Sequence, residues 1–169
     1  MSLFGTEFKS FEDLFEQQIM DLYDAEHRIT EALPKLAETA SSSQLKQAFL
    51  SHLAETQQQV KRLEQIFGML GKEPKRESCP AMKGLLAEGE EMIKAKADPH
   101  VKDAALIAAA QRVEHYEMSG YGTARTFAER LGHSEAAKLL QITLLEERSA
   151  DKKLTAIAEQ SVNTGAMNS

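Results

Sequence analysis

Apolar residues recur along this chain at intervals of three and four positions, which is the period of an amphipathic α-helix. The pattern fills several long stretches, and none shows the two-residue alternation of a half-buried strand. We therefore expect an all-α protein with helices over residues 10–40, 43–70, 80–97, 98–131 and 134–162.

Capping residues mark most of the expected helix ends. Ser10, Ser78 and Ser134 precede helical stretches and offer side-chain oxygens to the first amide groups. Asp98, followed by proline, is a strong start signal. Glycine follows the second and third long stretches, where a left-handed residue ends a helix. Pro34 lies inside the first helix and predicts a bend there.

Connection lengths predict how the helices are arranged. The first two long helices are joined tightly, as are the last two, so each pair should form an antiparallel hairpin. Residues 72–98 are long enough to run back along the bundle and carry the short helix. A four-helix bundle with one long central crossover is the ferritin-like arrangement. We expect one domain over residues 1–169, with frayed ends at 1–9 and 163–169.

Every long helix has polar residues near the centre of its apolar face. They are, in chain order, Glu26, then His52, Glu55 and Gln59, then Glu114 and Glu117, and finally Glu147 and Asp151. Buried carboxylates are costly unless they are paired, protonated or bound to a cation. Two divalent cations would neutralise four of these charges, and helical i, i+3 and i, i+4 neighbours can reach one ion. Oxygen ligands favour iron, manganese or magnesium over zinc or copper.

Each acid also has an interpretation without a metal. Glu26, Glu117 or Asp151 alone fits a boundary residue whose stem packs while its carboxylate reaches water, and Asp151 could pair with a base. Acids at mid-length on every long helix favour a site over separate boundary residues, because buried acids are rare without partners.

The second and fourth long helices leave assignments open. His52 fits a ligand, a hydrogen-bond donor behind the ligands, or a satisfied core histidine. Gln59 fits a ligand or a donor to a carboxylate. Glu146 lies one step off the apolar stripe, so we prefer Glu147 as the ligand.

Charge and composition limit the classes of partner and the compartment that we expect for this protein. A net charge of -6 argues against nucleic acid or an anionic membrane surface as the main partner. No apolar run approaches the ~20 residues of a membrane span, and the first residues lack the features of a signal peptide. The single Cys79 excludes an internal disulfide and suits a reducing compartment, so we expect a cytoplasmic protein.

Several motifs together resemble the YciF-type bacterial stress proteins. They lie at residues 22–26 (LYDAE), 52–56 (HLAET), 79–85 (CPAMKGL), 103–111 (DAALIAAAQ), 113–117 (VEHYE), 121–123 (YGT) and 143–151 (TLLEERSAD). The resemblance covers about residues 10–160. It implies a ferritin-like four-helix bundle, a cytoplasmic homodimer, a carboxylate-bridged dimetal site and a link to stress responses, without an established reaction.

The chain departs from the wider ferritin-like pattern, which has Glu-x-x-His on the second and fourth helices. Gln58 and Ala150 stand where those histidines would be. His52 precedes its glutamate instead, and Asp151 could replace the second histidine. By position, Glu26 and Glu114 would be terminal ligands, with Glu55 and Glu147 as bridges.

Two functions remain in competition. The first is a dinuclear iron or manganese protein that handles metal or scavenges oxidants. The second is a non-enzymatic helical scaffold whose acids hold protons or hydrogen bonds. Either function is compatible with a homodimer, for which the sequence offers apolar candidates: Phe4, Phe8, Phe11, Ala104, Ala105, Ala108 and Ala109.

Overall fold

The computed structural model describes residues 7–169, which are mostly helical and contain no strand. The elements are α1 (Phe11–Thr39), α2 (Ser43–Met69), α3 (Pro80–Lys94), α4 (Pro99–Leu131), α5 (Ser134–Ile157), the π-helical turn η1 (Ala158–Val162) and α6 (Asn163–Met167). The expected all-α class is confirmed. Within residues 7–169, no helix has the length and apolar character needed to cross a membrane.

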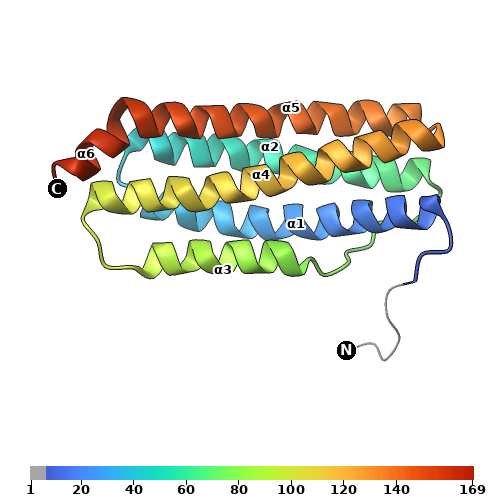
Figure 1. The fold of residues 1–169 in the computed structure, drawn as a ribbon, viewed down its shortest axis with the longest axis horizontal. Coiled ribbons are helices and arrows are strands. Elements are labelled where there is room, and N and C mark those ends of the chain that lie inside the picture. Colours follow the sequence, from blue (N-terminus) through green and yellow to red (C-terminus); the bar gives the residue numbers. More distant parts are fainter. Residues whose placement is uncertain (1–6) are drawn as a thin grey trace.

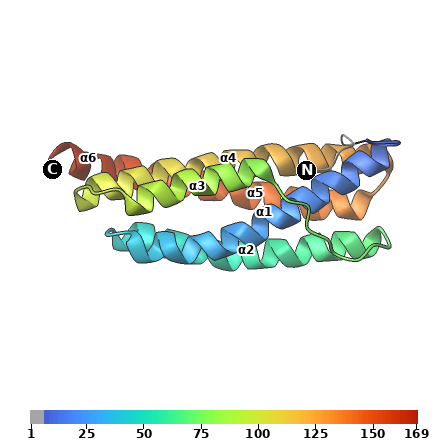
Figure 2. The ribbon, with the colours of Figure 1, turned by 90° about the horizontal axis from the view of Figure 1, so that it is seen from below.

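The four long helices form the bundle that the connection lengths predict. Helices α1 and α2 pack as one hairpin and α4 and α5 as the other, while α1 also contacts α4 and α2 contacts α5. After α2 the chain returns along the bundle, and α3 lies outside it against α1 and α4 (Figures 1 and 2). This return is the long central crossover of a ferritin-like bundle.

A polar layer divides the core of the bundle into two apolar parts. One part includes Phe15, Ile66 and Leu140, and the other includes Leu45, Phe49 and Leu106. The layer between them consists of buried polar side chains from all four long helices: Glu26, His52, Thr56, Gln59, Glu114, Glu117, Thr143 and Glu147. The apolar stripes therefore bury as predicted, and their polar interruptions meet at one depth.

Two of the expected helix starts are confirmed. The Ser10 hydroxyl accepts a hydrogen bond from the amide of Asp13 at 3.0 Å. The Asp98 carboxylate accepts one from the amide of His100 at 2.9 Å. Helix α1 continues through Pro34 without a break.

Two other caps were predicted at the wrong residue. Helix α5 is preceded by His133, which makes no side-chain cap bond, and Ser134 is the first helical residue. The His133 ring instead contacts Glu12 at 2.7 Å. Helix α3 is capped by Cys79 rather than Ser78, because the Cys79 sulfur accepts from the amide of Met82 at 3.3 Å.

The crossover is fastened to α1 through the buried carboxylate of Asp24. Its oxygens accept hydrogen bonds from the Cys79 amide at 2.9 Å, from Arg76 Nε at 3.0 Å and from Arg28 Nε at 2.6 Å. Charge-assisted bonds of this kind are stronger than neutral ones, so Asp24 holds the start of α3 at mid-bundle.

Small residues permit close approach at two helix contacts. Gly89 of α3 faces Ala109, which is buried, so part of the alanine stripe expected at a dimer interface is covered by α3 instead. A β-carbon at Gly120 would lie 2.8 Å from Leu22 Cδ2, so this glycine lets α4 approach α1.

The C-terminal residues differ from the expected frayed end. The chain turns through η1 and continues as α6, which packs against α4. A β-carbon at Gly165 would lie 2.7 Å from His100 Nδ1, so the glycine permits this contact.

Asp103 offers a test of how the hairpins are joined at one end. Its buried carboxylate accepts the amides of Ser41 and Ser42 at 2.8 and 2.7 Å, which ties the α1–α2 turn to α4. We expect Asp103→Ala to lower the free energy of unfolding by about 2 kcal/mol in urea titrations. Asp98→Ala, which removes an exposed cap, is the matched control and should cost clearly less. Equal losses would contradict a special role for Asp103.

Candidate metal centre

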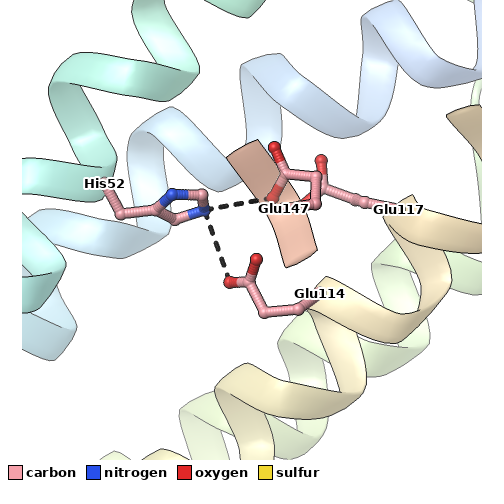
Figure 3. A group of neighbouring side chains, drawn as sticks. All are labelled: His52, Glu114, Glu117 and Glu147. Carbon is pink, nitrogen blue, oxygen red and sulfur yellow. Dashed lines mark ion pairs between the residues drawn. The ribbon is translucent and has the colours of Figure 1, made fainter. Parts of the chain in front are cut away.

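Four buried side chains converge in the polar layer. His52 comes from α2, Glu114 and Glu117 from α4, and Glu147 from α5, and each offers a ligand atom within 4.8 Å of the others (Figure 3). These four residues are called the inner group below. Helical phase explains the convergence, because each residue lies on the buried stripe of its helix.

The His52 ring links two carboxylates of the inner group. Its Nε2 atom lies 3.3 Å from Glu114 Oε1 and 3.6 Å from Glu147 Oε2. One ring nitrogen cannot satisfy both oxygens with a single proton, so the group remains short of donors.

Many oxygens of the cluster have no hydrogen-bond partner although they are buried. The unpartnered carboxylate atoms are Glu26 Oε2, Glu114 Oε2, both oxygens of Glu117, and Glu147 Oε2. An unpaired polar group in the core costs free energy that a well-packed protein normally avoids. Bound cations would provide partners for these atoms.

Glu26 lies beside the inner group rather than inside it. It is fully buried, and the Tyr121 hydroxyl donates a hydrogen bond to its Oε1 atom. Tyr121 is itself buried, one helical turn beyond Glu117 on α4. Tyr121 thus has a definite partner in the polar layer.

The buried carboxyl groups have strongly raised proton affinities. Burial raises the pKa of Glu26, Glu114 and Glu117 well above the ordinary value of 4.5, and neighbouring carboxylates raise it further. Burial also raises the pKa of Glu147, although His52 and the hydrogen bond from Gln59 oppose this. Without a cation, the cluster therefore retains protons at pH values where exposed glutamates have lost them.

Gln59 supports Glu147 from outside the inner group. Its Nε2 atom donates to Glu147 Oε1 and, at 3.1 Å, to Glu146 Oε2. Two carboxylates on one side fix the amide orientation, because its oxygen would be repelled there. Of the two roles open to Gln59, the structure shows the donor to a carboxylate.

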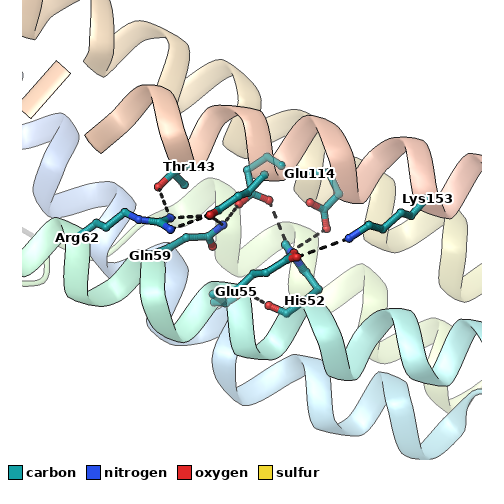
Figure 4. Close-up of polar contacts among 10 residues, drawn as sticks. His52, Glu55, Gln59, Arg62, Glu114, Thr143 and Lys153 are labelled. Carbon is teal, nitrogen blue, oxygen red and sulfur yellow. Dashed lines mark hydrogen bonds and ion pairs between the residues drawn. The ribbon is translucent and has the colours of Figure 1, made fainter. Parts of the chain in front are cut away.

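The choice between Glu146 and Glu147 follows from their partners. Glu147 is fully buried in the inner group. Glu146 instead forms a two-pronged pair with Arg62, at 2.5 and 2.7 Å, and Arg62 also donates to Thr143 at 3.2 Å (Figure 4). Arg62 was not recognised in the sequence, although its i, i+3 spacing from Gln59 could have indicated it.

Glu55 does not occupy the bridging position that was expected of it. Its Oε2 atom lies 3.3 Å from His52 Nδ1, and its other oxygen lies 3.5 Å from Lys153 (Figure 4). The buried track of α2 passes through Thr56, so Glu55 is rotated toward the helix edge and its side chain is 31% exposed. Bonding to His52, together with Lys153, lowers the pKa of Glu55 despite its partial burial.

Asp151 also lies outside the inner group, for the same reason of helical phase. Ala150 takes the buried position on α5. The Asp151 carboxylate accepts from Gln111 Nε2 at 2.9 Å and pairs with His115 at 3.2 Å. It is therefore the acid with a basic neighbour that the sequence left open, rather than a substitute for a second histidine.

A small cavity of ≈ 10 Å³ borders the inner group between α2, α4 and α5. His52, Glu55, Glu114 and Lys153 are among its lining residues. This volume is about that needed by one water molecule. Two of its lining residues, Glu55 and Lys153, are partly exposed, so the cavity lies on the side of the cluster that is nearer the surface.

The available donors suit a divalent transition metal. The inner group combines one imidazole nitrogen with carboxylate oxygens and contains no thiolate. The buried Cys79 lies elsewhere, with its sulfur 3.0 Å from the Tyr116 hydroxyl. Mixed oxygen and imidazole sites suit iron and manganese, whereas soft sulfur ligands favour other metals. The residues present thus fit such an ion, and the unpartnered oxygens give it a structural reason to bind.

Comparisons with known proteins agree with this architecture. The family model of a domain of unknown function, DUF892, matches residues 10–167. Protein YciF of Escherichia coli K12 is 48% identical over 161 residues, covering 95% of this chain and 97% of that protein. The crystal structure of the E. coli stress protein YciF has a TM-score of 0.89 and covers 92% of this chain and 99% of that one.

Other solved structures extend the comparison. YcfI of Rhodopseudomonas palustris is 44% identical, with a TM-score of 0.89 over 92% of this chain and 99% of that one. A ferritin-like, diiron-carboxylate protein of Bacillus anthracis has a TM-score of 0.66 at 18% identity, over 89% of this chain and 99% of that one, and shows the fold alone. This chain therefore belongs to the DUF892 family, is a homologue of YciF, and has a ferritin-like fold.

Proposed function

We propose that this protein binds iron or manganese in the polar layer of its bundle, as a dinuclear carboxylate centre. The observation that carries the proposal is the set of buried, unpartnered oxygens on Glu26, Glu114, Glu117 and Glu147. No other buried base than His52 lies in this part of the described chain to balance them. A divalent cation is the partner that resolves this imbalance best.

The surrounding residues have supporting roles in this proposal. Glu55 orients His52 through Nδ1, which is how metal-binding histidines are commonly held. Gln59 and Tyr121 do the same for Glu147 and Glu26. Each of these three residues keeps one atom without a hydrogen-bond partner. These atoms are His52 Nε2, Glu147 Oε2 and Glu26 Oε2.

We further propose a role in metal handling or in protection against oxidative stress, since the E. coli relative is described as a stress protein. Bound iron or manganese would supply one-electron redox chemistry that protein side chains lack. The ligands bury that centre in an apolar bundle, where water and competing ligands are largely excluded.

A non-enzymatic scaffold is the second candidate function. The observation that favours it is the absence of Glu-x-x-His on both relevant helices, where Gln58 and Ala150 stand instead. In that case the cluster would hold protons, as its raised pKa values allow.

Metal content separates the two functions. Protein produced with iron or manganese should carry the ion through gel filtration, as measured by elemental analysis. Chelation should then lower the melting temperature by about 5–10 °C, because a tightly bound ligand stabilises the folded state. Protein without ion under both growth conditions, and with no change on chelation, would support the scaffold.

The metal-free protein should lose stability as pH rises. Folding raises the pKa of Glu114 and Glu117 above the ordinary value of 4.5. Their contribution to stability is therefore complete below pH 4.5 and is lost as the pH rises through the raised pKa values of the folded protein. Glu114→Gln should weaken this loss and stabilise the metal-free protein by about 1–2 kcal/mol at alkaline pH. Thermal unfolding at several pH values, with the exposed Glu31→Gln as control, measures the effect. Parallel curves for both variants would contradict it.

We also propose a cytoplasmic homodimer. Phe8 and Phe11 are 44% and 42% exposed near the start of α1, although the Phe11 ring also packs on Phe127 of its own bundle. Phe4 lies outside the described residues. A buried free Cys79 suits a reducing compartment.

Light scattering at micromolar concentration tests the dimer. The expected mass is twice the 18.7 kDa of one chain, and Phe8→Asp should shift it toward one chain by placing a charge in an apolar contact. The metal content should remain, since Phe8 precedes α1 and Glu26 lies about halfway along that helix. A wild-type mass of 18.7 kDa would refute the dimer.

A further inference from the structure

We propose that the two halves of the acidic cluster are unequal: the first divalent cation binds at His52, Glu114, Glu117 and Glu147, and Glu26 serves only a second, weaker position. This inference rests on the proposed metal-binding function and specifies the order in which its positions fill.

Convergence of ligand atoms distinguishes the two halves. The inner group brings its ligand atoms within 4.8 Å of one another, so one ion can reach all four side chains (Figure 3). Glu26 is as deeply buried but does not belong to this group. An ion in the inner group therefore gains a nearly complete ligand set without any change in Glu26.

Nitrogen ligands are confined to one half. Among the described residues, His52 is the one histidine that lies in the polar layer. Other histidines contact residues outside this layer. His115 pairs with Asp151, His133 contacts Glu12, and His27 packs against Tyr23. Imidazole suits iron and other transition metals, and the inner group adds it to the carboxylates that also suit manganese. The Glu26 half lacks this advantage.

Hydrogen bonding further restricts Glu26. The Tyr121 hydroxyl occupies its Oε1 atom, which leaves Oε2 as the one unpartnered oxygen. Glu117, by contrast, has two unpartnered oxygens and lies in the inner group. A second ion would thus have one free oxygen from Glu26 and would have to share Glu117 with the first ion.

Access also favours the inner group. The cavity between α2 and α5 borders His52 and Glu114, whereas Glu26 is not among its lining residues. A cation that entered through this cavity would therefore meet the nitrogen-containing half first.

Manganese titration of the metal-free protein tests the inequality directly. Binding is followed by calorimetry, and the Mn²⁺ electron paramagnetic resonance spectrum tells an isolated ion from a coupled pair. Wild-type protein with one equivalent should show an isolated ion, and any second ion should bind at least about tenfold more weakly. Glu26→Gln keeps the shape of the side chain and an acceptor for Tyr121.

The variants give opposite expectations. Glu26→Gln should leave the first dissociation constant within about threefold of wild type and abolish the second event. His52→Gln should weaken the first event at least about tenfold. Glu31→Gln, on the exposed surface of α1, is the matched control and should change neither. Melting curves of each metal-free variant verify that it is folded.

Three results would overturn the inference while leaving the metal-binding function intact. They are two ions of equal affinity in wild type, a coupled pair at one equivalent, and a first event weakened at least about tenfold by Glu26→Gln. Wild-type protein that binds no manganese and no ferrous iron would instead refute the proposed function itself, and the inference with it.

Discussion

The burial of several carboxyl groups at one depth is the constraint on which this structure depends. Acids such as Glu117 are kept from water by apolar side chains on both sides of the polar layer, and these same side chains provide the burial that holds the bundle together. The layer cannot be relieved by moving one side chain, because its members come from four helices. Hydrogen bonds from surrounding side chains stabilise the layer, but several of its buried carboxylate oxygens still have no donor. A cation is a suitable partner for these oxygens.

Periodicity alone predicted the fold well, because the bundle is a consequence of which helix faces are apolar. The stripe of α1, from Phe15 through Glu26 to Leu36, is buried along its whole length. Helix starts were less predictable, because contacts distant in sequence decide them. His133 stands before α5 in place of a serine cap and its ring is held by Glu12, while the amide of Cys79 is taken by Asp24.

The candidate site could be predicted in outline and not in detail. Glu26, Glu114, Glu117 and Glu147 lie on buried stripes, and the structure brings the last three together with His52, while Glu26 lies beside them. Counting steps of three and four cannot decide between adjacent positions such as Glu55 and Thr56. A rotation of about 100° per residue separates those two positions, and only packing against other helices resolves it. Predicting the ion pair between Arg62 and Glu146 requires knowing how α2 and α5 are aligned along the bundle, and the sequence of a single helix does not give this.

In the short segment from Asp24 to Glu26, the two acidic side chains point in different directions. Asp24 fastens the crossover on the outside of α1, while Glu26, two residues later, points into the polar layer. Ala25 between them is fully buried, so there is no room for a larger side chain. A substitution at any of the three positions therefore disturbs its neighbours' surroundings as well. This stretch therefore has to meet the requirements of the crossover and of the cluster at the same time.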